Sequence, residues 1–179
     1  EKAIKLEKDA LAQIETITAD NARLVSNLHA NLGGLYRMNG HPDLAREHME
    51  KSISLLDQFN LLHINDSIPQ IANYAMFLTE QQEPERGISE LQKLSGIIKE
   101  YHSDHCLDYA KVQETLGTIY LMTANLPQAK THFKRAFKIY EKIWADEPEM
   151  IEAKYQEIQE LYPQIGFCIG KNLSGLLTK

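Results

Sequence analysis

Apolar residues recur at spacings of three and four along most of this chain, and this spacing places them on one face of an α-helix. The clearest stripe consists of Phe133, Phe137, Tyr140 and Trp144, and we expect it to be core. Short breaks such as Asn39-Gly40-His41-Pro42 separate these stretches. Gly or Asn can end a helix in the left-handed conformation, and Pro is tolerated in the first turn of the next helix. The pattern predicts roughly seven or eight antiparallel helices.

The same pattern returns every 42 residues. Leu32-Gly33-x-x-Tyr36 is repeated as Tyr74-Ala75-x-x-Leu78, as Leu116-Gly117-x-x-Tyr120 and, in part, as Ile158-Gln159-x-x-Tyr162. A fixed period of this length is typical of a stacked array of helix pairs, which presents surface rather than enclosing an active site. We therefore expect an all-α fold, a right-handed α-α superhelix (solenoid) of antiparallel helix pairs.

The register divides the chain into one repeat domain over residues 1–179. We expect a half repeat at 1–19, full repeats at 20–61, 62–103 and 104–146, and a partial repeat with a C-terminal cap at 147–179. Because the chain begins in mid-repeat, we expect it to be part of a longer protein.

Small residues occupy fixed places in each period, at Gly33, Ala75 and Gly117 and again at Ala45, Gly87 and Ala129. A glycine inside a helix costs about 1 kcal/mol relative to alanine, so its recurrence needs a reason. We expect these positions to mark the close approach of the two helices in each pair.

Charge and composition narrow the class of function. The net charge of −6 argues against nucleic acid as a partner, since phosphate binding needs a basic face. No apolar run is long enough to span a bilayer. Two cysteines, Cys106 and Cys168, lie without a disulfide framework, which favours a reducing compartment; we expect a cytoplasmic protein.

The third period, Leu116-Gly117-x-x-Tyr120 followed by Ala129, Phe133 and Ala136, resembles the tetratricopeptide repeat. The common repeat of that family has 34 residues, and the longer unit here is similar to the 42-residue kinesin light chain type. The segment 104–110 resembles the link of that type but lacks its proline. The resemblance implies a non-catalytic module that binds a peptide or a partner protein's segment in a concave groove lined by the first helix of each pair.

Carried onto this chain, the resemblance assigns groove positions in three repeats. Asn31 and Asn73 are the foremost candidates, because a side-chain amide can both donate to and accept from an extended peptide backbone. Methionines would make the groove adaptable. The full set of expected partner-binding residues is Asn27, Asn31, Gly34, Arg37, Met38, Asn73, Met76, Thr79, Lys111, Glu114, Thr115, Thr118 and Met122.

Other chemistry finds little support in the sequence. His102-x-x-His105-Cys106 has ligand types suited to zinc, but no second cluster completes the four ligands. Gly166-x-x-x-Gly170-Lys171-Asn172 is one residue short of a phosphate loop and lacks the Ser or Thr that holds magnesium. His29 reads as an isolated residue at a groove edge. We expect no catalytic residues, no metal site and no cofactor.

Two alternatives to peptide binding remain open. One is a regulatory or sensor domain of a bacterial signalling protein, either a peptide receptor or an ATPase-linked transcription regulator. The other is an oligomerisation module, because the N-terminal half repeat, with Ile4, Leu11 and Ile14, would be left without its partner helix.

Overall fold

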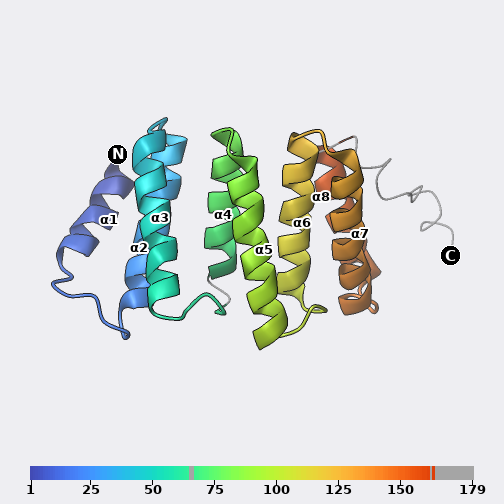
Figure 1. Cartoon of the computed structure of the whole chain (residues 1–179), viewed down its shortest axis with the longest axis horizontal. Helices are drawn as coiled ribbons and strands as arrows, with labels where there is room; N and C mark the ends of the chain where they lie inside the picture. The colour runs from blue at the N-terminus through green and yellow to red at the C-terminus, as the bar shows by residue number, and fades with distance from the viewer. Residues whose placement is uncertain (65–66, 162, 164–179) are drawn as a thin grey trace. The chain divides into compact units, whose positions relative to one another are not determined.

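The computed structural model describes residues 1–64, 67–161 and 163, and every element in these residues is a helix or a turn (Figure 1). The proposed C-terminal cap, the rejected phosphate-loop segment and Cys168 lie outside the described residues. The described helices are α1 (Lys2–Ala12), α2 (Ala22–Met38), α3 (Pro42–Gln58), α4 (Ser67–Glu80), α5 (Pro84–Tyr101), α6 (Leu107–Met122), α7 (Leu126–Ile143) and α8 (Pro148–Leu161).

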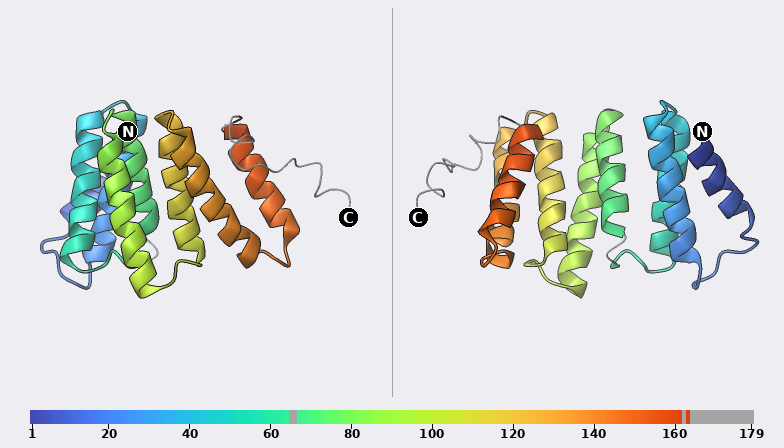
Figure 2. Two further views of the ribbon diagram at one scale, coloured as in Figure 1. Left: turned by 45° about the vertical axis from the view of Figure 1, so that its right-hand side comes forward. Right: turned by 180° about the vertical axis from the view of Figure 1, so that it is seen from behind.

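The chain divides into two compact units. Unit 1 comprises Glu1–Ile97 and contains α1 to α4 and most of α5, whereas unit 2 comprises Ile98–Lys179 and contains the last turn of α5 and α6 to α8. Within unit 1, α2 and α3 form an antiparallel pair, and α1 lies against α2 (Figure 2). Within unit 2, α6 and α7 form the corresponding pair, and α8 contacts α7. The finer division of the chain into repeats stays a prediction.

The three turns inside the helix pairs have one geometry. The left-handed conformation recurs 42 residues apart, with φ of 74° at Gly40, 66° at Gln82 and 58° at Ala124. One residue later, the backbone N–H bonds back to the carbonyl five residues earlier, which satisfies a carbonyl group that the helix end would leave free. These three hydrogen bonds are His41 to Tyr36 (3.0 Å), Glu83 to Leu78 (2.8 Å) and Asn125 to Tyr120 (2.7 Å).

The residues in these left-handed positions differ from the sequence expectation in two of the three turns. Glycine fills the position only in the first turn, whereas Gln82 and Ala124 fill it in the others. Asn125, the residue after Ala124, caps the next helix, because its side-chain oxygen accepts a hydrogen bond from the backbone N–H of Gln128 at 3.4 Å. The hydrogen bonds of the motif therefore override the intrinsic preference of the residue.

The expectation for the small residues is confirmed. A Cβ atom built on Gly33 would lie 2.6 Å from Cγ of Met49 in α3, and one on Gly117 would lie 2.9 Å from the Phe133 ring in α7. In the second pair the roles are exchanged, because a Cβ on Gly87 of α5 would lie 2.6 Å from the carbonyl oxygen of Ala75 in α4. Each helix pair thus depends on at least one missing side chain.

Apolar positions predicted from the period form the core. In unit 1 the buried cluster contains Leu32, Tyr36, Ala45, Met49, Tyr74, Phe77 and Leu78. In unit 2 the stripe on α7 is buried at Phe133, Phe137 and Tyr140, and the Tyr140 ring stacks on Trp144 with centroids 4.9 Å apart. The core stripe predicted from the sequence is therefore confirmed.

Candidate functional site

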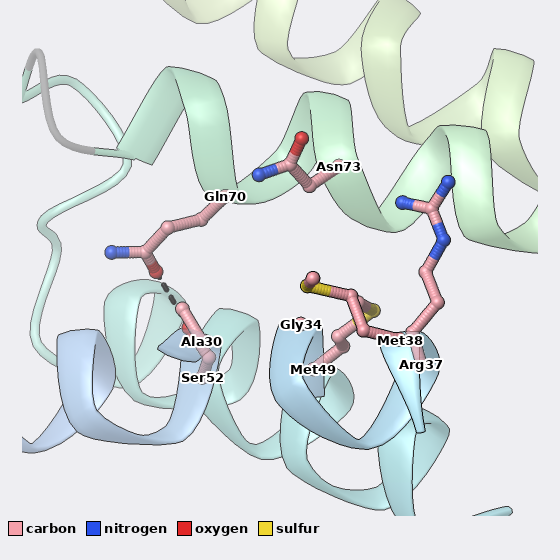
Figure 3. A pocket seen from close by; sticks show the side chains of 8 residues that line it. All are labelled: Ala30, Gly34, Arg37, Met38, Met49, Ser52, Gln70 and Asn73. Carbon is pink, nitrogen blue, oxygen red and sulfur yellow. Dashed lines mark hydrogen bonds between the residues drawn. The ribbon is translucent and has the colours of Figure 1, made fainter. Parts of the chain in front are cut away.

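A pocket with a volume of about 170 Å³ in unit 1 is formed by α2, α3 and α4 (Figure 3). Four of the expected partner-binding residues line it, namely Gly34, Arg37, Met38 and Asn73. The structure adds four residues to this wall: Ala30, Met49, Ser52 and Gln70. The pocket thus brings together side chains from two successive repeats.

Asn73 is the polar side chain of the pocket with the most freedom to bind a ligand. It lies on the exposed face of α4, and among the described residues its amide has no hydrogen-bond partner. Next to it the pocket offers apolar surface, since the Met38 side chain is 84% exposed. A Cβ atom on Gly34 would have no neighbour within 4 Å, so the wall is open there. A free amide beside flexible thioethers suits an extended peptide with an apolar side chain.

A buried polar cluster fixes one end of this pocket. The Oε1 atom of Gln70 on α4 accepts hydrogen bonds from the hydroxyls of Ser26 at 2.9 Å and Ser52 at 2.5 Å, and its Nε2 atom donates to Oδ1 of Asn27 at 2.5 Å. These bonds join α2, α3 and α4 across the repeat boundary. Asn27, expected to meet a partner, therefore already accepts a hydrogen bond from Gln70 within the fold.

An ion pair fixes the other end. The guanidinium of Arg37 at the end of α2 donates to both carboxylate oxygens of Glu80 at the end of α4, with 2.8 Å between Nε and Oε2. A bidentate pair of this kind holds both side chains in one geometry. Arg37 thus lines the pocket, but its charge is balanced by Glu80.

The second foremost candidate, Asn31, lies away from this pocket. It is exposed, and its Nδ2 atom donates a hydrogen bond to Oε1 of Glu7 on α1 at 3.1 Å. The remaining expected residues of unit 1, Met76 and Thr79, are half-buried. The hydroxyl of Thr79 donates a hydrogen bond to the carbonyl oxygen of Ala75 at 2.9 Å. In unit 1, the structure therefore places some of the expected partner-binding residues in one pocket and the others outside it.

In unit 2 the expected residues face different surroundings. Glu114 on α6 accepts hydrogen bonds from the Tyr140 hydroxyl at 2.6 Å and from Nζ of Lys154 at 2.9 Å, so it joins α6, α7 and α8. Burial lowers the pKa of Lys154, but Glu114 and Glu157 together outweigh this effect through charge and hydrogen bonding, and the net shift is upward. Lys111 pairs with Asp108 at 3.9 Å, and Thr115 bonds within its own helix. Thr118 is buried, whereas Met122 is 45% exposed.

Sequence reasoning missed a polar pairing that follows the repeat. In the first repeat His29 and His48 approach at 2.8 Å between their Nδ1 atoms, and His48 stacks on Tyr36. Exactly two periods later Gln113 and His132 approach at 2.9 Å, and His132 stacks on Tyr120. The interpretation of His29 as an isolated residue was wrong. Comparison of the first and third periods would have found the signal, because His48 and His132 lie 84 residues apart, which is two periods.

Burial explains the chemistry of this pair. The His29 ring is 6% exposed, and burial, together with His48 and Lys51, lowers its pKa to about 4. Burial also lowers the pKa of His48, on which Glu47 acts in the opposite direction. One ring must donate and the other accept, so the accepting ring must be neutral, and the lowered pKa values keep both rings neutral at pH 7. The pair therefore acts as a neutral link between α2 and α3.

In the link before α6, the residues whose types would suit zinc make other contacts. The Sγ atom of Cys106 accepts a hydrogen bond from the backbone N–H of Tyr109 at 3.4 Å, so the thiol caps α6. His105 approaches the Asp104 carboxylate at 2.5 Å. Within the described part of the chain, no three His, Cys, Asp or Glu side chains gather as a metal site would need.

Repeated helix pairs, with small residues at each crossing and a common turn geometry, define an α-solenoid built from repeats. Comparison with known families agrees: residues 67–142 match the sequence model of the tetratricopeptide repeat. The matched segment, 67–142, thus carries the sequence signature of tetratricopeptide repeats. Its narrower resemblance to the 42-residue kinesin light chain type stays a prediction.

A solved structure supports the fold. The crystal structure of BtubC (BKLC) from P. vanneervenii superposes with a TM-score of 0.68 at 21% sequence identity. The match covers 79% of this chain and 56% of that chain, so the present sequence spans little more than half of the solved protein. No curated protein sequence matches the chain. In the described residues no helix combines the length and apolar character that a membrane crossing demands.

Proposed function

We propose that unit 1 binds a peptide, or an extended segment of a partner protein, in the pocket between α2 and α4. Tetratricopeptide repeats generally mediate protein–protein interactions and are typically non-catalytic. The observation that carries the proposal for this chain is the free amide of Asn73 beside the exposed Met38. In this proposal Asn73 holds the peptide backbone, and the methionines receive an apolar side chain. Placement of the protein in the cytoplasm stays a prediction.

The fixed ends of the pocket support this proposal. Gln70 and Arg37 each bind a partner in the fold, so they can hold α2 and α4 at a constant separation while a ligand enters between them. A site that is rigid before binding loses less entropy when the ligand arrives. The sequence predicts a groove over three repeats, whereas the site proposed here is one pocket formed by two of them. Asn31 becomes a weaker candidate, because a peptide would have to compete with Glu7 for its amide.

Peptide selection from a random displayed library, followed by titration of the selected peptide, tests this function. Asn73→Ala removes a donor and an acceptor, so we expect the affinity to fall about five- to tenfold. Gln92→Ala, an exposed amide on α5 outside the pocket, is the matched control and should leave the affinity unchanged. Equal affinities of Asn73→Ala and wild type for every selected peptide would contradict the proposed site.

Self-association through α1 is a second candidate, because Leu6 on this helix is 61% exposed and no α1 residue is fully buried. Sedimentation of the same samples separates the two functions. A monomer at all concentrations excludes self-association and leaves peptide binding intact.

A further inference from the structure

A second pocket, of about 390 Å³, lies entirely within unit 2. Its walls come from the last turn of α5, the link that precedes α6, the start of α6 and one face of α7. The α7 residues follow a spacing of three, one and three positions, so they share one helix face. The lining residues are Lys99, Asp104, His105, Tyr109, Arg135, Lys138, Ile139 and Lys142.

The pocket combines an apolar base with a cationic rim. Tyr109 and Ile139 are 3% and 5% exposed, so they contribute surface at the bottom of the pocket. The three cations of α7 are exposed and stand around it. Lys99 is half exposed and lies over the Tyr109 ring, with 5.2 Å between Nζ and the ring centroid. Such a contact keeps the ammonium group at the mouth of the pocket.

The charge of this pocket is opposite to that of the chain. Four basic side chains, Lys99, Arg135, Lys138 and Lys142, face one carboxylate, in a protein of net charge −6. That carboxylate, Asp104, lies 2.5 Å from His105 and 4.0 Å from Lys99. It therefore neutralises at most part of the rim.

Two of the cations have no counterion in the part of the chain that the structure describes. There, Lys138 and Lys142 have no carboxylate within ion-pair distance. Arg135 donates from Nη1 to Oε1 of Gln113 at 3.2 Å, a neutral acceptor that leaves its charge uncompensated. Like charges held on one helix face repel each other. An anion bound between them would relieve this repulsion.

We propose that this pocket binds the phosphate group of a phosphorylated ligand. A phosphate monoester carries close to two negative charges at neutral pH and three strong acceptor oxygens, which matches a rim of one guanidinium and three ammonium groups. A compact dianion also fits a pocket better than a run of carboxylates, which needs an extended groove. The surface of Tyr109 and Ile139 would receive the carbon part of the ligand. The phosphate belongs either to a free small molecule or to a phosphorylated protein side chain.

Calorimetric titration of the 179-residue chain tests this proposal with two probes, inorganic pyrophosphate and a short phosphoserine peptide. Pyrophosphate represents the free phosphate, and the peptide represents the phosphorylated side chain. In about 0.05 M salt, where charges are only partly screened, we expect at least one probe to bind. Binding of pyrophosphate alone points to a small molecule, and binding of the peptide at equal or higher affinity points to a protein ligand. Absence of binding by both probes would overturn the proposal.

Three variants separate a built site from general attraction. The double variant Lys138→Gln/Lys142→Gln should weaken binding at least tenfold. The control, Lys130→Gln/Lys134→Gln, removes the same charge from α7 but lies outside the pocket, and it should weaken binding less than twofold. Asp104→Asn removes the opposing carboxylate and should strengthen binding severalfold. All the substituted side chains are exposed, so thermal melting should show intact folds. Equal losses in the two lysine pairs would refute the pocket as the binding site.

Discussion

Two glycines of the same helix should respond oppositely to the same substitution. Gly87 and Gly96 both lie inside α5, and replacing a helical glycine by alanine stabilises a helix by about 0.5–1 kcal/mol when nothing opposes the methyl group. At Gly96 nothing lies within 4 Å of the added Cβ. We therefore expect Gly96→Ala to raise the free energy of unfolding by that amount.

Gly87 faces backbone instead of solvent. Its Cβ would lie 2.6 Å from the carbonyl oxygen and 3.2 Å from Cα of Ala75, both in the backbone of α4. Normal contacts need about 3.5–4.0 Å, so α4 and α5 must separate by roughly 0.5–1 Å, and no side-chain rotation can avoid it. Overpacking of this kind costs about 1–3 kcal/mol, which exceeds the gain in helix propensity. We expect Gly87→Ala to destabilise the protein by about 1–2 kcal/mol.

Gly33→Ala gives an intermediate case, because the nearest atom to its Cβ is Cγ of Met49, on a flexible side chain that can move. Thermal unfolding by circular dichroism measures all three. For a chain of this size each kcal/mol shifts Tm by about 2–4 °C, so Gly96→Ala and Gly87→Ala should differ by roughly 3–12 °C. A Gly87→Ala variant that melts at or above wild type would refute the argument that backbone contact sets the spacing of α4 and α5.

Two further predictions concern the repeated turns and the histidine pair. Ala124→Gly should raise Tm, because Ala124 has φ of 58° and glycine adopts this conformation without strain, a gain of about 1 kcal/mol. The control, Ala153→Gly, changes an exposed residue inside α8 and should lower Tm by a similar amount. A lower Tm for Ala124→Gly would contradict the role assigned to the turn. His29, with a pKa of about 4 in the fold against 6.5 unfolded, binds fewer protons when folded, so its contribution to stability is complete above about pH 6.5 and declines as the pH falls toward 4. His29→Gln reproduces the Gln113–His132 pairing of the third repeat and should lose less stability between about pH 7 and pH 4.5 in urea unfolding; an unchanged loss would show that His29 is not a source of acid sensitivity.

The period predicts the scaffold because it reports packing that every repeat must satisfy. Gly87 lies at a helix crossing where any side chain would meet the backbone of α4, and Ala45 and Ala129 are fully buried at the equivalent positions. Turn positions follow the period equally well. The identity of the left-handed residues does not, since Gln82 and Ala124 are held there by hydrogen bonds that the sequence does not display.

Groove residues are harder to predict, because register fixes the direction of a side chain but not what it meets. Asn31 and Asn73 occupy equivalent positions, yet α1 presents Glu7 to the first, and the second has no partner among the described residues. Glu114 has the register of a groove residue, but Lys154 of α8 binds it. Each outcome depends on a residue outside the repeat to which the asparagine or glutamate belongs, so the repeat pattern alone does not predict it.

The same reasoning explains why the repeat pattern did not predict the cationic pocket of unit 2. Lys138 and Lys142 on α7 are in register with each other, but Lys99 belongs to the preceding repeat and Asp104 to the link. Only the packing of α7 against the start of α6 and the end of α5 collects them around Tyr109 and Ile139. In a repeat protein the residues that share a register define the scaffold, whereas the sites arise where unlike positions of neighbouring repeats meet. A search for function in a protein built from helical repeats should therefore compare the contacts across repeat boundaries, as the polar cluster around Gln70 also shows.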